Sequence, residues 1–321
     1  MRQYLSLILL FNVNSTPCVA HEPPLPSSFE QYPLEQVSNH IFIVHGTQEL
    51  PSEKTRGFMN NPAAILTENG VIIVDPGSSE EIGRLLLKKV LGVSNKPVIA
   101  VFNTHVHGDH WLGNHGIRDA YPGVPIYAHL RMIERVEAGE GEDWIKLLMG
   151  MTNGAIEGTK VVGPNIGLKG GEELTLDGIT LKIHHTGHAH TDHDLMIEVV
   201  DDKGLFFGDV VAADRVPNSD VPQDASFKGS ISAIRTMMKR PVELYIPGHG
   251  HSGGREIPEA SLGFLETLYS SVTKYYNQGL ESYEMKDKVK EELGEYKDWH
   301  NFNEMDRVIN FVFQEVERDN F

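Results

Sequence analysis

The chain has 321 residues, of which 40% are hydrophobic, so it can bury a sizeable core as one large layered domain or two small ones. Its 45 acidic residues against 28 basic ones give a formal net charge of −17, which disfavours binding to nucleic acid or to an anionic membrane. The one cysteine, Cys18, lies in the first 20 residues, and the rest of the chain therefore has neither disulfides nor thiolate metal ligands.

The first 20 residues have the pattern of a secretory signal peptide. Arg2 precedes an apolar run over residues 4–11, and small residues lead up to Ala20, after which we expect cleavage. A buried N-terminal strand or helix is the alternative, because Arg2 is the only positive charge before the run. No later run reaches the roughly 18 apolar residues of a membrane-spanning helix. We therefore expect a periplasmic or secreted protein with no membrane span.

In the first half of the remaining chain, the sequence pattern predicts strands that alternate with helices. Residues 40–44 form a strand, and residues 63–67 and 71–74 form a hairpin, in which Asn69-Gly70 suits a type I′ turn. Ser79 then caps an amphipathic helix over residues 80–91. The continuous apolar run 98–102 predicts a buried strand, so a helix-covered sheet is expected.

For two segments, one irregular and one apolar, the sequence allows either a role at a site or a purely structural role. The loop 46–62 is long enough to be a flap over a site, although a passive surface loop is equally compatible with its composition. The apolar helical segment 143–151 either covers the same site or completes the core.

The second half repeats the order of strands followed by a helix. Residues 172–176 and 179–184 form a hairpin at Asp177-Gly178, and strands follow over residues 195–200 and 204–207. A helix over residues 230–238 and a last strand over residues 242–246 complete this unit. From Pro258 onward the pattern predicts two or three helices, broken at Gly279 and Gly294.

Four potential metal ligands crowd into the segment directly after the strand 98–102. His105 and His107 are two residues apart, so on extended backbone their imidazoles point to the same side. Gly108 permits a change of direction, and Asp109 and His110 follow at the start of a helix. Protonated imidazoles this close together repel one another, and binding a divalent cation in their place removes that repulsion.

Further ligand candidates lie in loops next to later strands, where side chains can converge. They are His188, His190, Asp209 and His249. Each is a weak signal alone, because a single histidine is usually structural and Gly-Asp is a common turn.

Taken together, these residues resemble the metallo-β-lactamase superfamily, whose ordered signature is His-x-His-x-Asp-His followed by His, Asp and His. The match in order, spacing and strand-end placement covers about residues 40–255. The resemblance implies an α/β fold, a four-layer αββα sandwich with the site at one edge between the sheets. We therefore expect a catalytic domain over residues 21–255, with residues 256–321 as a helical extension packed on it.

The resemblance also implies which side chain binds which ion. The first metal would be bound by His105, His107 and His190, the second by Asp109, His110 and His249, and Asp209 would bridge both. His190 is preferred because the family's ligand precedes a threonine, and His188 is the alternative. Asp75 matches an aspartate that supports the ligand loop. His184, His185 and His193 are expected to support ligands or the structure.

Two zinc ions are the expected cofactors, although nitrogen and oxygen donors would also accept iron or manganese. Two such ions can lower the pKa of a shared water from 15.7 to about 7, and Asp109 would orient the resulting nucleophile. The expected activity is hydrolysis of a small ester, thioester, lactone or amide, with weak β-lactamase activity at most. Substrate choice is expected to belong to the irregular segments 46–62, 139–165 and 214–227.

Several alternatives stay open within this resemblance. The segment around His190 looks most similar to periplasmic quinoprotein relay metallohydrolases, but those have glycine where this chain has His193. Glyoxalase II-like enzymes are a related branch. A persulfide dioxygenase would bind a single iron through His105, His107 and Asp209, and a non-catalytic periplasmic protein would only bind zinc. The helical tail could form a homodimer.

Overall fold

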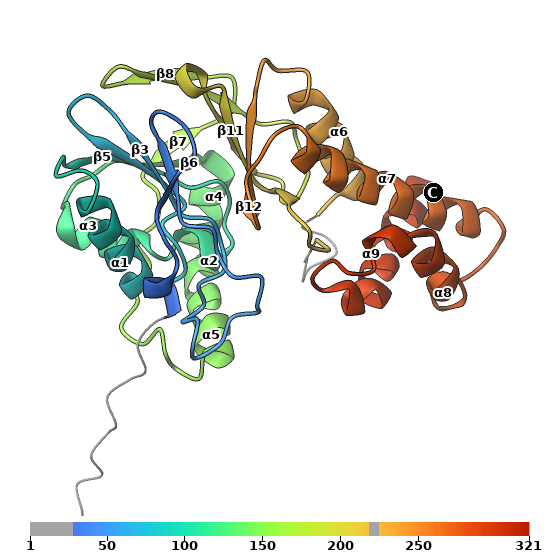
Figure 1. The fold of residues 1–321 in the computed structure, drawn as a ribbon. Helices are drawn as coiled ribbons and strands as arrows, with labels where there is room; N and C mark the ends of the chain where they lie inside the picture. Colours follow the sequence, from blue (N-terminus) through green and yellow to red (C-terminus); the bar gives the residue numbers. More distant parts are fainter. Residues whose placement is uncertain (1–27, 218–224, 321) are drawn as a thin grey trace, which may run out of the picture.

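The computed structural model describes residues 28–217 and 225–320, so the predicted signal peptide over residues 1–20 lies outside the described residues. Two β-sheets pack face to face, with helices on both outer faces and a group of helices at the C-terminal end (Figure 1). The predicted αββα sandwich with a helical extension is confirmed. In the described ranges, no helix combines the length and apolar character needed to cross a membrane.

The first sheet has seven strands in sequence order. They are β1 (Glu35–Gln36), β2 (Ile41–Ile43), β3 (Ala63–Leu66), β4 (Val71–Val74), β5 (Val98–Phe102), β6 (Ile126–His129) and β7 (Ile166–Leu168). Strands β1 to β4 pair antiparallel, whereas β4 to β7 pair parallel. Loops that leave the carboxyl ends of the parallel strands therefore meet at one edge of the sheet.

The second sheet has five strands. Across the sheet they are β12 (Leu244–His249), β11 (Gly204–Ala212), β10 (Met196–Val199), β9 (Ile179–His184) and β8 (Glu173–Leu176). Only β11 and β12 pair parallel, so their carboxyl ends lie side by side. Between the two sheets lies a buried apolar layer to which both contribute, including Ile72, Phe102, Leu181 and Phe206.

Helices cover both outer faces of the sandwich. The α-helices are α1 (Glu80–Leu91), α2 (Gly108–Trp111), α3 (Asn114–Ala120), α4 (Leu130–Arg135), α5 (Gly141–Met151), α6 (Phe227–Met237), α7 (Glu256–Tyr276), α8 (Ser282–Glu292) and α9 (Met305–Asp319). The short helical turns are η1 (Ser28–Gln31), η2 (Val136–Glu140), η3 (Val200–Asp202), η4 (Gly294–Tyr296) and η5 (Phe302–Glu304).

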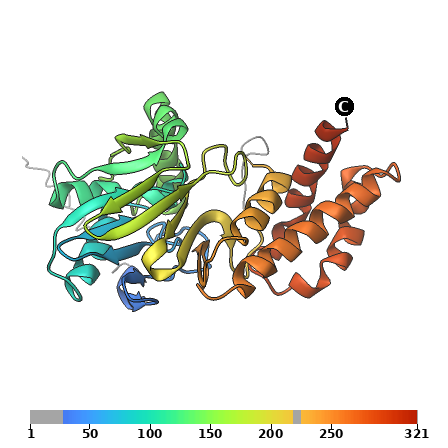
Figure 2. The same ribbon diagram turned by 90° about the horizontal axis from the view of Figure 1, so that it is seen from above.

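The outer helices belong to three buried clusters, one of which joins α2, α4 and α5. Helices α1 and α3 pack on the first sheet, while α6 and α7 pack on the second, and α8 and α9 pack against α7. Figure 2 shows the C-terminal helices as one group beside the second sheet. Helix α7 therefore supplies part of the outer layer of the sandwich as well as the base of the extension.

The first hairpin differs in detail from the predicted type I′ turn. Neither Asn69 nor Gly70 has a positive φ, and the backbone pair Thr67 and Gly70 places Glu68 and Asn69 at the tip. Gly70 is needed for space instead, because a Cβ there would lie 2.6 Å from the Ile99 side chain. The second hairpin does have positive φ at Asp177 and Gly178, as a type I′ turn requires.

Candidate metal centre

The ligand loop runs from the end of β5 into α2. His105 is fully buried, and His107 directly precedes α2, in which Asp109 and His110 occupy the first turn. Gly108 has no positive φ, so its role differs from the predicted change of direction. A Cβ on Gly108 would lie 2.8 Å from Cβ of Trp144, so glycine lets α5 approach the loop.

The structure brings all seven predicted ligands together from the two sheets. One group contains His105, His107, His190 and Asp209, and a second contains Asp109, His110 and His249. Within each group the potential ligand atoms lie within 4.8 Å of one another. Asp209 joins the groups, because its carboxylate lies 3.1 Å from Nε2 of both His110 and His249.

Hydrogen bonds on the outer side of three rings determine which nitrogen faces the centre. His110 Nδ1 lies 2.9 Å from Asp75 Oδ2, and His249 Nδ1 lies 2.9 Å from the Met59 carbonyl oxygen. Both acceptors require a proton on Nδ1, so Nε2 is the nitrogen that faces the centre and is available to a metal. His105 follows the same rule, with Nδ1 lying 3.0 Å from Thr104 Oγ1.

The cluster contains the donor atoms of a metal site, and some of these atoms are buried without a hydrogen-bond partner among the described residues. His105 Nε2 is buried and has no hydrogen-bond partner among the described residues. Ring nitrogens also face one another, with His107 Nδ1 lying 3.0 Å from His190 Nε2 and His110 Nε2 lying 3.4 Å from His249 Nε2. Ring nitrogens this close must share either a proton or a cation, and a divalent cation bound between them would replace the proton.

The ionisation of these groups follows from burial and from their charged neighbours. Burial, together with the adjacent histidines, holds the pKa of His105 and His107 well below its usual range, so both are neutral, as a metal ligand must be. Burial opposes a proton on His110 too, yet Asp209 and Asp109 raise its pKa well above the usual value. Asp209 and Asp109 therefore favour a positive charge at the centre of the cluster.

The histidines outside the cluster have structural contacts. His190 faces the cluster, whereas His188 is exposed and belongs to neither group. His184 lies 2.8 Å from Glu198, and His185 lies 2.9 Å from the Asp194 carbonyl oxygen. Buried His193 accepts a hydrogen bond from the Val106 backbone at 3.2 Å, which fixes the ligand loop between His105 and His107.

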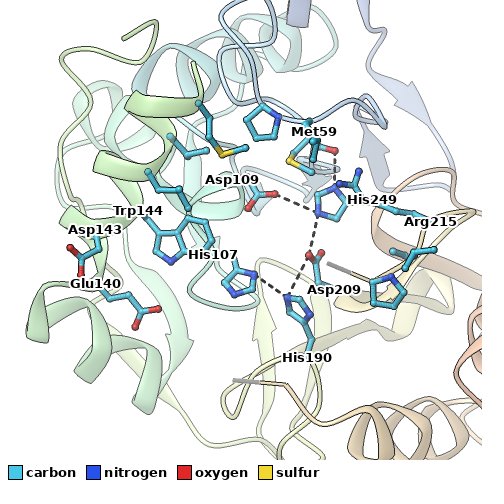
Figure 3. A pocket seen from close by; sticks show the side chains of 18 residues that line it. Met59, His107, Asp109, Glu140, Asp143, Trp144, His190, Asp209, Arg215 and His249 are labelled. Atoms are coloured by element: carbon cyan, nitrogen blue, oxygen red, sulfur yellow. Dashed lines mark hydrogen bonds and ion pairs between the residues drawn. The ribbon is translucent and has the colours of Figure 1, made fainter. Parts of the chain in front are cut away.

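The cluster forms one wall of a pocket of about 250 Å³ (Figure 3). The loop 46–62 contributes Leu50, Pro51 and Met59, so this loop does reach the site. Helix α5 contributes an apolar wall of Trp144, Leu147, Leu148 and Met151. The segment 143–151 thus covers the site, and Leu148 belongs to the core as well.

Arg215 is a pocket residue that sequence reasoning did not identify. It lies in the loop after β11, within the segment 214–227 that was expected to influence specificity, and it is only 2% exposed. No local pattern distinguishes it from a surface arginine, because its neighbours in space come from distant parts of the chain.

The fold and this arrangement of histidines and aspartates agree with comparisons to known proteins. The family model described as the Metallo-beta-lactamase superfamily matches residues 55–249, more than half of the chain. The chain therefore belongs to the metallo-β-lactamase superfamily, as the resemblance in its motifs predicted.

Individual relatives are more distant. A linear primary-alkylsulfatase from Pseudomonas sp. (strain ATCC 19151) is 22% identical over an alignment of 256 residues, and the match covers 69% of this chain and 48% of that relative. A hydroxyacylglutathione hydrolase from Gloeobacter violaceus is 39% identical over 59 residues, which are 18% of this chain and 21% of that protein. The chain thus spans about half or less of the length of these two relatives.

Solved structures share the fold at low sequence identity. A metallo-β-lactamase from Pontibacter korlensis has a TM-score of 0.58 at 20% identity and covers 74% of this chain and 99% of its own. A variant of the sec-alkyl sulfatase PisA1 has a TM-score of 0.70 at 18% identity and covers 88% of this chain and 50% of its own. Residues 1–255 make up less than 88% of the chain, so the region matched by the sulfatase structure includes part of the C-terminal helices.

Proposed function

We propose that the chain is a dinuclear, zinc-dependent hydrolase that cleaves a small ester, thioester, lactone or amide. The observation that carries this proposal is the pair of His/Asp groups, joined by Asp209, in the wall of a largely apolar pocket. The expected ligands are His105, His107 and His190 for one ion and Asp109, His110 and His249 for the other, with Asp209 between them. When bound, the two ions supply Lewis-acid activation of water and of the substrate.

The side chains of the chain itself position the reactants. Asp109 Oδ2 lies 3.5 Å from Nε2 of both His110 and His249, and Asp109 also lines the pocket. A carboxylate at this position can orient an attacking water and accept its proton. The walls formed by α5 and the loop 46–62 flank the cluster and offer apolar surface to the substrate.

The relatives broaden the set of bonds to be tested. Alkyl sulfates belong in it because the alkylsulfatase matches 69% of the chain, and thioesters because of the shorter match to a hydroxyacylglutathione hydrolase. Weak β-lactamase activity is part of the proposal as a side reaction.

Metal analysis combined with one substitution tests this proposal. Protein purified without added metal should contain close to two zinc ions and hydrolyse at least one member of a panel of esters, thioesters, lactones, alkyl sulfates and a β-lactam. Asp109→Ala should lower kcat by at least about a hundredfold, the lower range for loss of a positioned acid–base group. Asp119→Ala is the matched control, because Asp119 lies on α3 outside the pocket.

Two results would contradict the hydrolase. One iron per chain with sulfite production would identify a persulfide dioxygenase, and bound zinc without turnover of any substrate would favour a non-catalytic binding protein. A periplasmic or secreted location and a homodimer stay proposals as well. N-terminal sequencing of the mature chain and its mass in solution are the measurements that check them.

A further inference from the structure

Arg215 is a buried cation with no carboxylate partner. Its side chain lines the pocket, and no Asp or Glu lies within ion-pair distance of it in the part of the chain that the structure describes. A buried guanidinium is normally paired, because burying an unpaired charge is costly. Burial accordingly lowers the pKa of Arg215, although the charges of Asp209 and Asp109 oppose that change.

Neutral oxygens from two distant segments hold the guanidinium in place. Nη1 donates to two oxygens of Gln48 in the loop 46–62, the backbone carbonyl at 3.2 Å and side-chain Oε1 at 3.5 Å. The side-chain oxygen of Asn301 faces the guanidinium and accepts hydrogen bonds from Nε at 3.2 Å and from Nη2 at 3.1 Å. These contacts engage up to four of the five N–H donors of the guanidinium, so they orient the group and leave an N–H on Nη2 for a further oxygen ligand.

The C-terminal extension fixes this part of the pocket. The His300 backbone pairs with the loop, donating to Asp214 and accepting from Val216, both at 2.9 Å. Asn301 follows with a φ of 63°, a conformation that asparagine tolerates better than most residues. Arg215 is therefore oriented by a segment that lies more than eighty residues further along the chain.

Charge and polarity differ between the two sides of the pocket. Figure 3 shows Arg215 on the His249 side of the cluster, whereas Trp144, Glu140 and Asp143 lie on the His107 side. The Trp144 ring lies 4.8 Å from the His107 ring, and Leu147 and Met151 of the same helix extend this side as apolar surface. Arg215 is the only lysine or arginine among the described lining residues, so an anionic group is favoured at one end only.

We propose that Arg215 binds the anionic group of an amphiphilic substrate whose apolar part lies along α5. The substrate class is a carboxylate, sulfonate or sulfate attached to an alkyl or similar apolar group. An oxyanion can accept a hydrogen bond from the remaining N–H and supplies a negative charge beside the unpaired guanidinium. Arg215 then determines specificity, and this inference builds on the proposed function by naming the substrate class of the same site.

Binding of simple amphiphiles to the metal-loaded full chain tests the assignment. Calorimetry with octanoate, octanesulfonate and 1-octanol compares two oxyanions with a neutral molecule of the same tail. Wild type should bind one or both oxyanions more tightly than 1-octanol. Arg215→Met should weaken that binding by about tenfold to a hundredfold, the range for a lost charged hydrogen bond, and leave 1-octanol unchanged. Arg215→Lys should fall between the two.

Matched variants separate recognition from a structural effect. Arg240→Met removes a guanidinium that is paired with Glu198 outside the pocket, and it should leave all three affinities unchanged. Metal content is measured for every variant, because bound metals attract oxyanions too. Should Arg215→Met lose its fold or its metal, Arg215→Lys and Asn301→Ala decide the question, since each should weaken oxyanion binding alone.

Oxyanion affinities equal to wild type in these variants, or an equal loss for 1-octanol, would overturn the assignment. Binding requires no turnover, so the two proposals fail in different ways. Arg215-dependent binding without hydrolysis of any substrate would reject the hydrolase and keep the anion site. If wild type and Arg215→Met both hydrolyse neutral and anionic substrates at the same rate, the hydrolase is kept and the anion site is rejected.

Discussion

Asp75 controls the candidate metal centre without belonging to either ligand group. Its carboxylate accepts hydrogen bonds from the Thr104 backbone at 2.9 Å, from Thr104 Oγ1 at 2.7 Å and from His110 Nδ1 at 2.9 Å. The first two hold the loop that carries His105, and the third fixes which nitrogen of His110 faces inward. One aspartate at the end of β4 therefore determines both the position and the tautomer of ligands in different groups.

Asp75→Asn should weaken metal binding while preserving the size of the side chain. An amide offers one acceptor oxygen to three donors, and in either orientation its NH2 group would face an N–H donor, that of the Thr104 backbone or of His110 Nδ1. We expect zinc affinity to fall by about tenfold to a hundredfold, as is usual for groups that orient ligands. Competition with a chromogenic chelator measures it, with Asp119→Asn as the control. Unchanged affinity would show that the ligands hold their geometry without Asp75.

The seven candidate ligands could be found from the sequence, whereas Arg215 could not. His105 to His110 form a dense local pattern, and an ordered motif identifies His190, Asp209 and His249, although Asp209 lies inside β11 rather than in a loop after a strand that ends at residue 207. Arg215 has no such pattern. Its importance comes from burial without a carboxylate and from contacts with Gln48 and Asn301, which are properties of the folded chain.

The junction of α7 and α8 depends on a cluster around Glu292. Its carboxylate accepts hydrogen bonds from Lys274 at 2.7 Å and from Tyr275 at 2.6 Å, and also from Ser271. These bonds, with Lys274 the strongest influence, lower the pKa of Glu292 to about 2. The folded state thus favours the ionised form, and the resulting stability is present above the ordinary pKa of 4.5 and is lost as the pH falls toward about 2.

Glu292→Gln should therefore destabilise the protein at neutral pH but not in acid. We expect a loss in unfolding free energy of less than about 1 kcal/mol at pH 7, because the ion pair is partly exposed to solvent. The difference from wild type should shrink as the pH is lowered. Urea unfolding of metal-free protein at several pH values measures this, with Glu291→Gln as the neighbouring control. A difference that does not vary with pH would rule out the carboxylate as its source.

Sequence patterns located most elements, and the errors have physical causes. Helix α3 and strand β7 were not predicted, because both contain glycine and are too short to display a clear apolar period. Strand β12 runs to His249 instead of ending at Ile246. Pro247 is tolerated there because β12 is an edge strand, paired only with β11. Helix α6 starts at Phe227 rather than at Ser230, because Ser226 caps it.

At the scale of the whole molecule, the C-terminal helices share a core with the second sheet. The cluster that contains Phe207 and Tyr245 of the sheet continues without interruption through Leu268 of α7 to Val312 of α9. Glu315 of α9 also accepts hydrogen bonds from Ser226 Oγ at 2.6 Å and the Phe227 backbone at 2.8 Å, where α6 begins. The predicted boundary at residue 255 therefore falls inside a continuous core, and the extension also orients Arg215.

A cavity in α7 should consequently weaken the whole sandwich rather than the extension alone. Leu268 is fully buried in the shared core, and Leu268→Ala should cost about 2–5 kcal/mol of unfolding free energy. Hydrogen exchange followed by mass spectrometry in mild urea resolves where that cost appears. We expect peptides from β5 and β11 to exchange faster together with those from α8 and α9, since one core unfolds cooperatively. Leu91→Ala, at an exposed position of α1 outside the pocket, serves as the control. Faster exchange confined to residues 256–320 would instead define the extension as an independent unit, and the orientation of Arg215 would then depend on docking between two units.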